Sequence, residues 1–229
     1  MRTAVTRELG NRGWSLVVTA PDILSFHYPS ALATSLPYIQ KAVRIELGGR
    51  SDDWPAEQRS VTSFVAESRP RLLQNAIVPV RVLAVDRTFW EKATILHDEY
   101  HRPTSKERGA RVSRHYADLA QIASDPEIGP RAIKNTALLA RVAQHKHTFY
   151  RNNWSRYEEA CPGTLRLVPP ADAVPSLRSD YGQMRDMYYE DPCPFEVILH
   201  QLKAIEAEVN ALPAALVAVD PTGETQGLP

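Results

Sequence analysis

The sequence is poor in cysteine and carries no excess of charge of either sign. Its 229 residues include two cysteines, Cys161 and Cys193, which are too few for a disulfide framework or a Cys/His zinc pattern. A reducing compartment, the cytoplasm, is therefore expected. The 27 basic residues balance the 27 acidic ones, which argues against a dominant electrostatic attraction to DNA or to an anionic membrane.

Long apolar runs and compact catalytic motifs are also missing. No segment approaches the ~18 apolar residues of a membrane span, so we expect no membrane association. Residues 1–14 are polar and lack the apolar centre of a signal peptide. The sequence has no Gly-rich phosphate loop and no nucleophile elbow. With 43% hydrophobic and 24% charged residues, it fits a globular protein with a substantial core.

Strand patterns occupy the first part of the chain. The predicted strands are residues 14–19, 24–28, 42–47, 61–65 and 78–85. The third alternates, with Val43 and Ile45 on one face and Arg44 and Glu46 on the other. Pro79 in the last one favours a sheet edge or a strand start, because proline cannot donate a ladder hydrogen bond.

Helix patterns follow the strands. A capping box, Thr88-x-x-Glu91, predicts that the first helix begins at Thr88. The predicted helices are residues 88–100, 112–123, 132–150, 177–188 and 195–212. This order predicts an α+β fold in which a small mixed or antiparallel sheet precedes a helical bundle. We predict a sheet domain with its closing helix at 1–101, a helical domain at 102–212 and a disordered tail at 213–229.

Lys92 falls in the opening turn of the first helix if Thr88 is the N-cap. A cation there opposes the helix dipole at a cost of about 0.3–1 kcal/mol. Its helical neighbours Phe89 and Leu96 place it beside the apolar face. Two interpretations stay open. The lysine and the helix amides face an anion such as phosphate, or the lysine stem covers apolar surface while the ammonium reaches water.

Carboxylates and arginines can complete a phosphate site around Lys92. Asp118 can orient that lysine or a metal-bound phosphate, or it can simply pair with Arg114 four residues before it. Glu46 can be a metal ligand or lie on the solvated side of an edge strand. Each arginine can contact phosphate bidentately or pair with a local acid. The arginines considered for phosphate binding are Arg44, Arg87 and Arg114.

Two further patterns have ordinary explanations. His97 and His101 have the i,i+4 spacing of a helical zinc site, but Asp follows the first histidine and no third ligand is evident, so a helix end explains them. Asp52 and Asp53 are adjacent, so on an extended chain they point to opposite sides and do not converge on one ion. We interpret the aspartates as part of a turn.

Five stretches carry a more specific signal when taken together. They are, in chain order, residues 43–50 (VRIELGGR), 87–92 (RTFWEK), 113–119 (SRHYADL), 145–146 (HK) and 176–184 (SLRSDYGQM). Each is weak alone, but their combination resembles the AbiEii/AbiGii-type nucleotidyltransferase toxin family over about residues 10–212. Members resemble DNA polymerase β-type nucleotidyltransferases and act as toxins of type IV toxin–antitoxin and phage-abortive systems.

The resemblance implies transfer of a nucleotide from a nucleoside triphosphate (NTP) to an acceptor, either tRNA or protein. Mg²⁺ would neutralise the triphosphate, and a cognate antitoxin is the implied partner. Residue by residue, Lys92 matches the active-site lysine of a Glu-Lys pair, and Asp118 matches the aspartate of an R-H-x-x-D stretch. Glu46 falls where a further strand acid is expected.

One family feature has no counterpart in this sequence. Family members carry a Gly-Gly-Thr or Gly-Ser segment and an Asp-x-Asp pair, which supplies the main metal ligands, and neither precedes Trp14. A truncation, a mis-called start codon and a degenerate relative all fit this departure. We expect no metal site beyond a Glu46 contribution, no transfer by this chain alone, and a homodimer through the surface left exposed. The alternative is a non-catalytic module that binds an antitoxin or nucleic acid.

Overall fold

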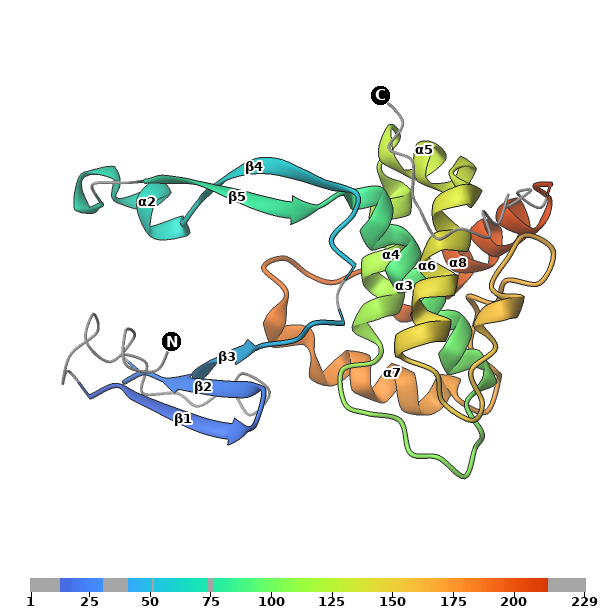
Figure 1. The fold of residues 1–229 in the computed structure, drawn as a ribbon, viewed down its shortest axis with the longest axis horizontal. Helices are drawn as coiled ribbons and strands as arrows, with labels where there is room; N and C mark the ends of the chain where they lie inside the picture. The colour runs from blue at the N-terminus through green and yellow to red at the C-terminus, as the bar shows by residue number, and fades with distance from the viewer. Residues whose placement is uncertain (1–12, 31–40, 51, 74–75, 214–229) are drawn as a thin grey trace.

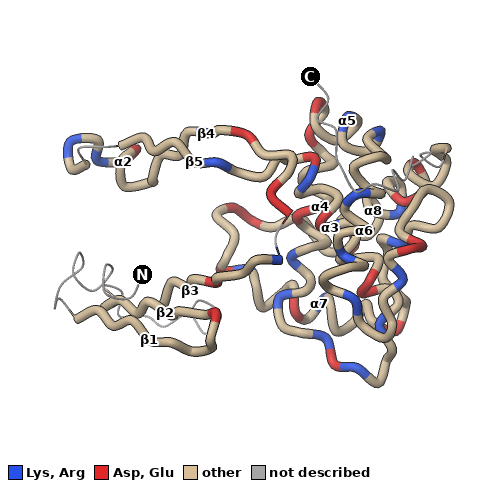
Figure 2. Tube along the Cα trace, viewed as in Figure 1, with Lys and Arg blue, Asp and Glu red and all other residues tan. Residues whose placement is uncertain are grey.

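The computed structural model describes residues 13–30, 41–50, 52–73 and 76–213. Two small β units come first and helices follow, which confirms the predicted α+β class (Figure 1). Both β units extend from the same side of the helical part. Figure 2 shows that β1 and β2 carry few charged residues, whereas Lys, Arg, Asp and Glu are frequent on the helices.

The first unit is a three-stranded antiparallel sheet with the order β1-β2-β3. Its strands are β1 (Ser15–Ala20), β2 (Ile23–His27) and β3 (Ala42–Glu46). Trp14 stacks on Phe26 with ring centroids 4.9 Å apart. Leu24 is buried, but Val18 and Val43 are exposed, so the sheet covers little of its own apolar surface.

The second unit is an antiparallel hairpin of β4 (Ala56–Thr62) and β5 (Ile77–Leu83), and it projects from the helices (Figure 1). The predicted strand at 61–65 is wrong after Thr62. There the Ser63 hydroxyl accepts a hydrogen bond from the Ala66 amide and caps the short helix α2 (Phe64–Ser68). The local cap overrides the apolar run that suggested a strand.

Six longer α-helices, joined by loops and short 3-10 helices, make up most of the rest of the described chain. They are α3 (Val85–His101), α4 (Arg114–Ser124), α5 (Ile128–Lys134), α6 (Thr136–Phe149), α7 (Val174–Gln183) and α8 (Phe195–Asn210). α3 packs against α4, α5 and α6, and α4 packs against α8. Fully buried side chains such as Trp90, Leu119, Leu139 and Leu202 form the core. Each such side chain stabilises the fold by roughly 1.5–3 kcal/mol.

The predicted start of α3 at Thr88 is wrong. The helix begins at Val85 with Ala84 as its N-cap, and the Thr88 hydroxyl donates to the Ala84 carbonyl at 3.4 Å instead of capping the helix. β5 leads directly into α3, so the helix, counted from its N-cap, starts four residues earlier than the capping-box pattern indicates. Lys92 therefore lies in the second turn, away from the free amides of the helix start.

The predicted single helix at 132–150 is also wrong. Asn135 has a non-helical backbone and separates α5 from α6. Its side-chain oxygen accepts a hydrogen bond from the Leu138 amide at 3.2 Å and so caps α6. Asparagine favours this role because its short polar side chain competes with helix continuation.

Two expectations concern the ends of the chain and the membrane. Of the predicted tail at 213–229, only Pro213 belongs to the described residues. Residues 1–12 also lie outside them. Within the described part, every helix is too short or too polar to cross a bilayer.

Candidate functional site

Lys92 on α3 lies against two side chains of α4. Its Nζ is 2.8 Å from Oδ2 of Asp118 and 3.2 Å from Nδ1 of His115. The side chains of Lys92 and Asp118 are 21% and 40% exposed, so solvent still reaches the pair. The predicted proximity of Lys92 and Asp118 is confirmed. Asp118 thus pairs across helices with Lys92, and its i,i+4 pair with Arg114 is not formed in the described structure.

His115 is neutral near pH 7. Burial lowers its pKa to about 4, and the positive charges of Lys92 and Arg114 add to the effect. A neutral imidazole can accept at Nδ1, so we assign the lysine ammonium as the donor to both neighbours. These contacts use two of its three N–H groups. Among the described residues the third remains available to an incoming oxygen.

Asp180 on α7 fixes the start of α4. Its carboxylate accepts from the Arg111 amide at 2.8 Å, and from the Ser113 amide at 3.0 Å and hydroxyl at 2.5 Å. Ser113 is the N-cap of α4, and Arg111 has a positive φ of 68°. The carboxylate thus satisfies backbone donors at a helix start, where negative charge is favoured. It positions the turn that presents His115 and Asp118.

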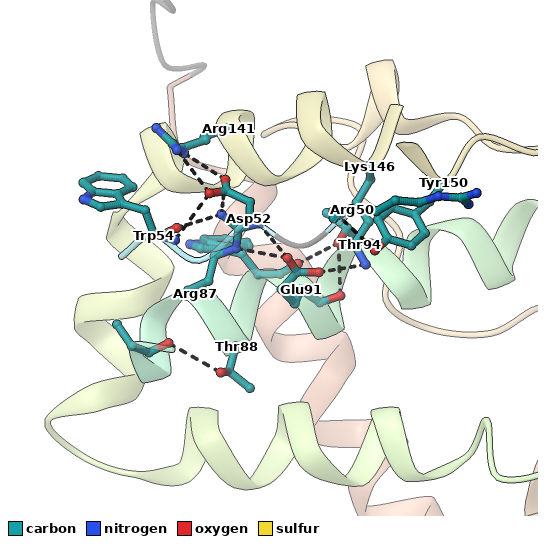
Figure 3. A network of polar contacts seen from close by, with 12 residues as sticks. Arg50, Asp52, Trp54, Arg87, Thr88, Glu91, Thr94, Arg141, Lys146 and Tyr150 are labelled. Carbon is teal, nitrogen blue, oxygen red and sulfur yellow. Dashed lines mark hydrogen bonds and ion pairs between the residues drawn. The ribbon is translucent and has the colours of Figure 1, made fainter. Parts of the chain in front are cut away.

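A second polar network lies on the α3–α6 side (Figure 3). Arg87 is fully buried, and its Nη1 is 2.8 Å from Oδ2 of Asp52, while its Nη2 is 2.7 Å from Oε1 of Glu91. It also donates to the Trp54 carbonyl. Arg141 on α6 contacts the same Asp52 carboxylate, with Nε 3.1 Å from Oδ2. The network therefore fastens the chain segment between β3 and β4 to two helices.

The charges of this network are matched. Burial alone would raise the pKa of Asp52, but hydrogen bonds from Arg141 and Arg87 outweigh it and lower that pKa to about 2. Burial would likewise raise the pKa of Glu91, but Lys146 and Arg87 lower it. Lys146 on α6 lies 2.7 Å from Oε2 of Glu91, the residue directly before Lys92. Both acids are therefore ionised near pH 7.

The predicted site residues fall into separate groups. Lys92 and Asp118 come together, and Arg114 is exposed on the same helix as Asp118. Glu46 and Arg44 pair with each other on β3, with Nε 2.8 Å from Oε1, and both side chains are largely exposed. Their predicted roles in metal or phosphate binding stay predictions. The guanidinium of Arg87 is directed into the protein, where it serves the network above.

The donor set does not fit a bound Mg²⁺. Magnesium needs oxygen ligands in octahedral geometry. Within the described ranges, no three His, Cys, Asp or Glu side chains converge on a common point. Asp118 is engaged by Lys92 and Glu46 by Arg44. We therefore derive no step through a metal.

His97 and Asp98 are structural residues. His97 is buried, hydrogen-bonds the Arg156 carbonyl through Nε2 and accepts from the Arg166 amide at Nδ1. Asp98 accepts from the Ser155 hydroxyl. The helix-end explanation given to His97 from the sequence is incomplete, because this ring joins α3 to the segment that follows α6.

Small antiparallel sheets precede a helical part, and a partly exposed lysine lies between a carboxylate and a neutral histidine. The sequence model described as "Nucleotidyl transferase AbiEii toxin, Type IV TA system" matches residues 2–205. The chain therefore belongs to the AbiEii nucleotidyltransferase toxin family of type IV toxin–antitoxin systems. No curated protein and no solved structure matches the chain.

Sequence reasoning missed the partners that complete these networks. Asp52 was interpreted as part of a turn, and Arg141 was not considered. These two residues are 89 positions apart, so no local pattern could join them. His115 and Lys146 lie inside the stretches that carry the family resemblance, and this was the only signal for them. Their spacing in the sequence did not predict a role for either residue.

Proposed function

We propose that Lys92, held in place by Asp118, binds the triphosphate of an NTP as part of a nucleotidyl-transfer site. The observation that carries this proposal is the 2.8 Å contact of the two side chains at a solvent-accessible junction of α3 and α4. Family membership supports the reaction class. The acceptor, tRNA or protein, and a cognate antitoxin as partner follow from the family resemblance and are proposed on that ground.

Each residue has a definite part in this proposal. The Lys92 ammonium meets a phosphate oxygen with its remaining N–H, and charge-assisted contacts of this kind are the stronger hydrogen bonds. Asp118 holds the ammonium in place, and neutral His115 accepts a hydrogen bond from it at Nδ1. Lys146 keeps Glu91 paired, so this acid does not compete for Lys92. Arg114, exposed one turn before Asp118, is a second phosphate contact.

Titration of an NTP followed by NMR tests the proposal. We expect weak binding, with a Kd of about 1 mM, because Lys92 is already paired and salt screens an exposed site. Lys92→Gln should abolish the shifts around α3 and α4. Lys203→Gln, a matched change of an exposed lysine on α8, should leave them intact. Identical shifts in all three proteins, or none in the wild type, would show that Lys92 has only a structural role.

Transfer itself is a separate measurement. We expect no incorporation of labelled NTP into bulk tRNA or protein by this chain alone with Mg²⁺. The reason is that the described residues bring no group of three or more potential metal ligands together. Incorporation that Lys92→Ala abolishes would contradict this expectation, and it would mean that acids elsewhere supply the metal ligands.

A specific observation favours a second candidate function, an interaction module. The far end of the β4–β5 hairpin exposes large apolar side chains, with Phe64 78%, Leu72 70% and Ile77 62% exposed. Exposed apolar patches of this kind mark interaction surfaces. A second copy of the chain is the partner to test first. Light scattering should give a dimer that Phe64→Ser with Ile77→Ser converts to a monomer; a wild-type monomer at all concentrations would exclude the homodimer.

A further inference from the structure

A cavity of about 580 Å³ opens beside α4, the helix that also carries Asp118. Its walls come from α4, from α8 and from the segment 188–193. Ala117 and Gln121 line it from α4, and in the helix these residues flank Asp118 at positions i−1 and i+3. The volume lies within the range of about 300–1,000 Å³ typical of small-ligand sites. The proposed triphosphate site and the cavity therefore share one helix.

Aromatic rings and amides face the cavity. Tyr181 and Tyr188 line it with ring centroids 5.7 Å apart, and Gln201 lines it from α8. The Tyr181 hydroxyl donates to the Cys193 carbonyl at 2.9 Å. The buried Tyr188 hydroxyl makes no hydrogen bond of good geometry among the described residues, although the Tyr181 hydroxyl is near enough to raise its pKa. Because a buried polar group without a partner is costly, this hydroxyl is suited to a ligand that bonds to it.

The Tyr188 ring lines the cavity, and its hydroxyl is buried. Burial raises the pKa of Tyr188, and the neighbouring Tyr181 and the carboxylates of Asp118 and Asp180 raise it further. A ligand that reaches both Lys92 and the cavity spans about one turn of α4, from Asp118 to Gln121.

We propose that this cavity binds the base of the nucleotide whose phosphates lie at Lys92. The inference rests on the proposed function and names the part of the substrate that the cavity receives. A flat heterocycle can stack on tyrosine, and its polar edge can bond with the Tyr188 hydroxyl and the amides of Gln121 and Gln201. The lining is therefore complementary to a base.

The acidic residues of the lining determine which end of the nucleotide enters. Glu190 and Asp191 line the cavity, but Asp191 is paired with Arg185, so the negative charge that disfavours phosphate there is chiefly that of Glu190. Carboxylate oxygens accept hydrogen bonds from exocyclic amino groups. Bases that carry an amino group (adenine, cytosine and guanine) are therefore favoured over uracil, which has none.

Uncharged nucleosides separate this inference from triphosphate binding. Adenosine, cytidine, guanosine and uridine are added singly to the full chain and followed by ligand-observed NMR and by amide shifts. We expect shifts on α4, α7 and α8 with the three amino-bearing nucleosides, and weaker shifts with uridine. Tyr188→Phe and Gln201→Ala should each weaken binding by about fivefold, the loss expected for one hydrogen bond.

Two control variants make the result interpretable. Gln183→Ala removes an exposed glutamine of α7 outside the cavity and should bind nucleosides as the wild type does. Lys92→Gln should also bind nucleosides normally while it loses triphosphate binding. Unchanged thermal unfolding of Tyr188→Phe, a change of one atom, establishes that its weaker binding is local.

The outcomes distinguish the two proposals. The absence of nucleoside shifts in the wild type overturns the cavity assignment, even where triphosphate binds in a Lys92-dependent way. Binding that neither Tyr188→Phe nor Gln201→Ala weakens also overturns it. Nucleoside binding with no Lys92-dependent triphosphate binding contradicts the proposed function and leaves the cavity as a base-binding site only.

Discussion

Asp180 accepts hydrogen bonds from both the backbone amide and the hydroxyl of Ser113, although 67 positions separate the two residues. Both belong to stretches that carry the family resemblance. Ser113 is the N-cap of α4, so a residue of α7 determines how the helix with Asp118 begins. This contact links two sequence features that have no visible connection in the chain itself.

We expect Asp180→Asn to lower the free energy of unfolding by about 1–2 kcal/mol, the range for losing a capping interaction at a helix start. The amide keeps the shape but offers a single acceptor oxygen without charge. Urea unfolding measures the change. Asp186→Asn, an exposed aspartate just beyond α7, is the control and should stay within about 0.5 kcal/mol of the wild type. Equal stability of both variants would argue against the cap.

Arg87→Ala should be much more damaging. The guanidinium is fully buried between Asp52 and Glu91, so its removal takes one cationic partner from each carboxylate and leaves them only Arg141 and Lys146. Breaking a buried ion pair from one side costs about 3–5 kcal/mol. Arg59→Ala removes an exposed arginine that pairs with Glu57 on the hairpin, and it should cost at most about 1 kcal/mol. Chemical denaturation of both variants makes the comparison, and similar losses would contradict the assignment.

Asp52 should make stability depend on pH between about 4 and 2. Its pKa is about 2 in the folded chain and about 3.9 in an unfolded one. A lowered carboxyl pKa stabilises the fold above the unfolded value, and this stability is lost as pH falls toward the folded value. We expect a loss of about 2 kcal/mol from this residue across that window.

Urea unfolding at several pH values measures this loss. Asp52→Asn removes the titrating group and should flatten the dependence relative to the wild type. The Glu91 pKa is also lowered, but it contributes to both proteins and cancels in the difference. Parallel curves for wild type and variant would contradict the role of Asp52.

Lys92→Met should raise the pKa of His115. Burial is the largest cause of the low pKa, and the Lys92 charge is the next. With the cation removed, the Asp118 carboxylate favours the protonated imidazole, so the titration moves upward while burial still holds it below the ordinary range. NMR titration of the ring protons measures the shift. Lys203→Met is the control, and an unmoved His115 in Lys92→Met would contradict the contact.

The sequence predicted those parts of the fold that local periodicity controls. The apolar spacing of α8 gave its position, and the structure places Phe195, Ile198, Leu202, Ile205 and Val209 in the core. The start of α3 was not predictable in the same way. Glu91 completes a capping-box pattern with Thr88, but its partners are Arg87 and Lys146, and the second lies on another helix.

The candidate site was predicted by resemblance and not by spacing. Nothing in the two helical patterns required Lys92 and Asp118 to meet, because the sequence of the charged loop between the helices does not predict how they pack. Asp52 shows that local sequence patterns do not predict contacts between distant residues. Its interpretation as a turn residue followed from its neighbours, whereas its function depends on Arg141, which only the folded chain brings close.

The base of the β4–β5 hairpin is held at one place. Arg87 binds the Trp54 carbonyl, Arg141 covers the Trp54 ring at 4.6 Å, and the Ala84 amide donates to the Pro55 carbonyl. Strands of seven residues extend roughly 23 Å from that base at about 3.3 Å per residue. A rotation of about 10° at the base would displace the far end by roughly 4 Å over this length. The hairpin can therefore pivot about the Asp52–Arg87–Arg141 cluster. Glu91, which is bound to the same Arg87, directly precedes Lys92 in the sequence.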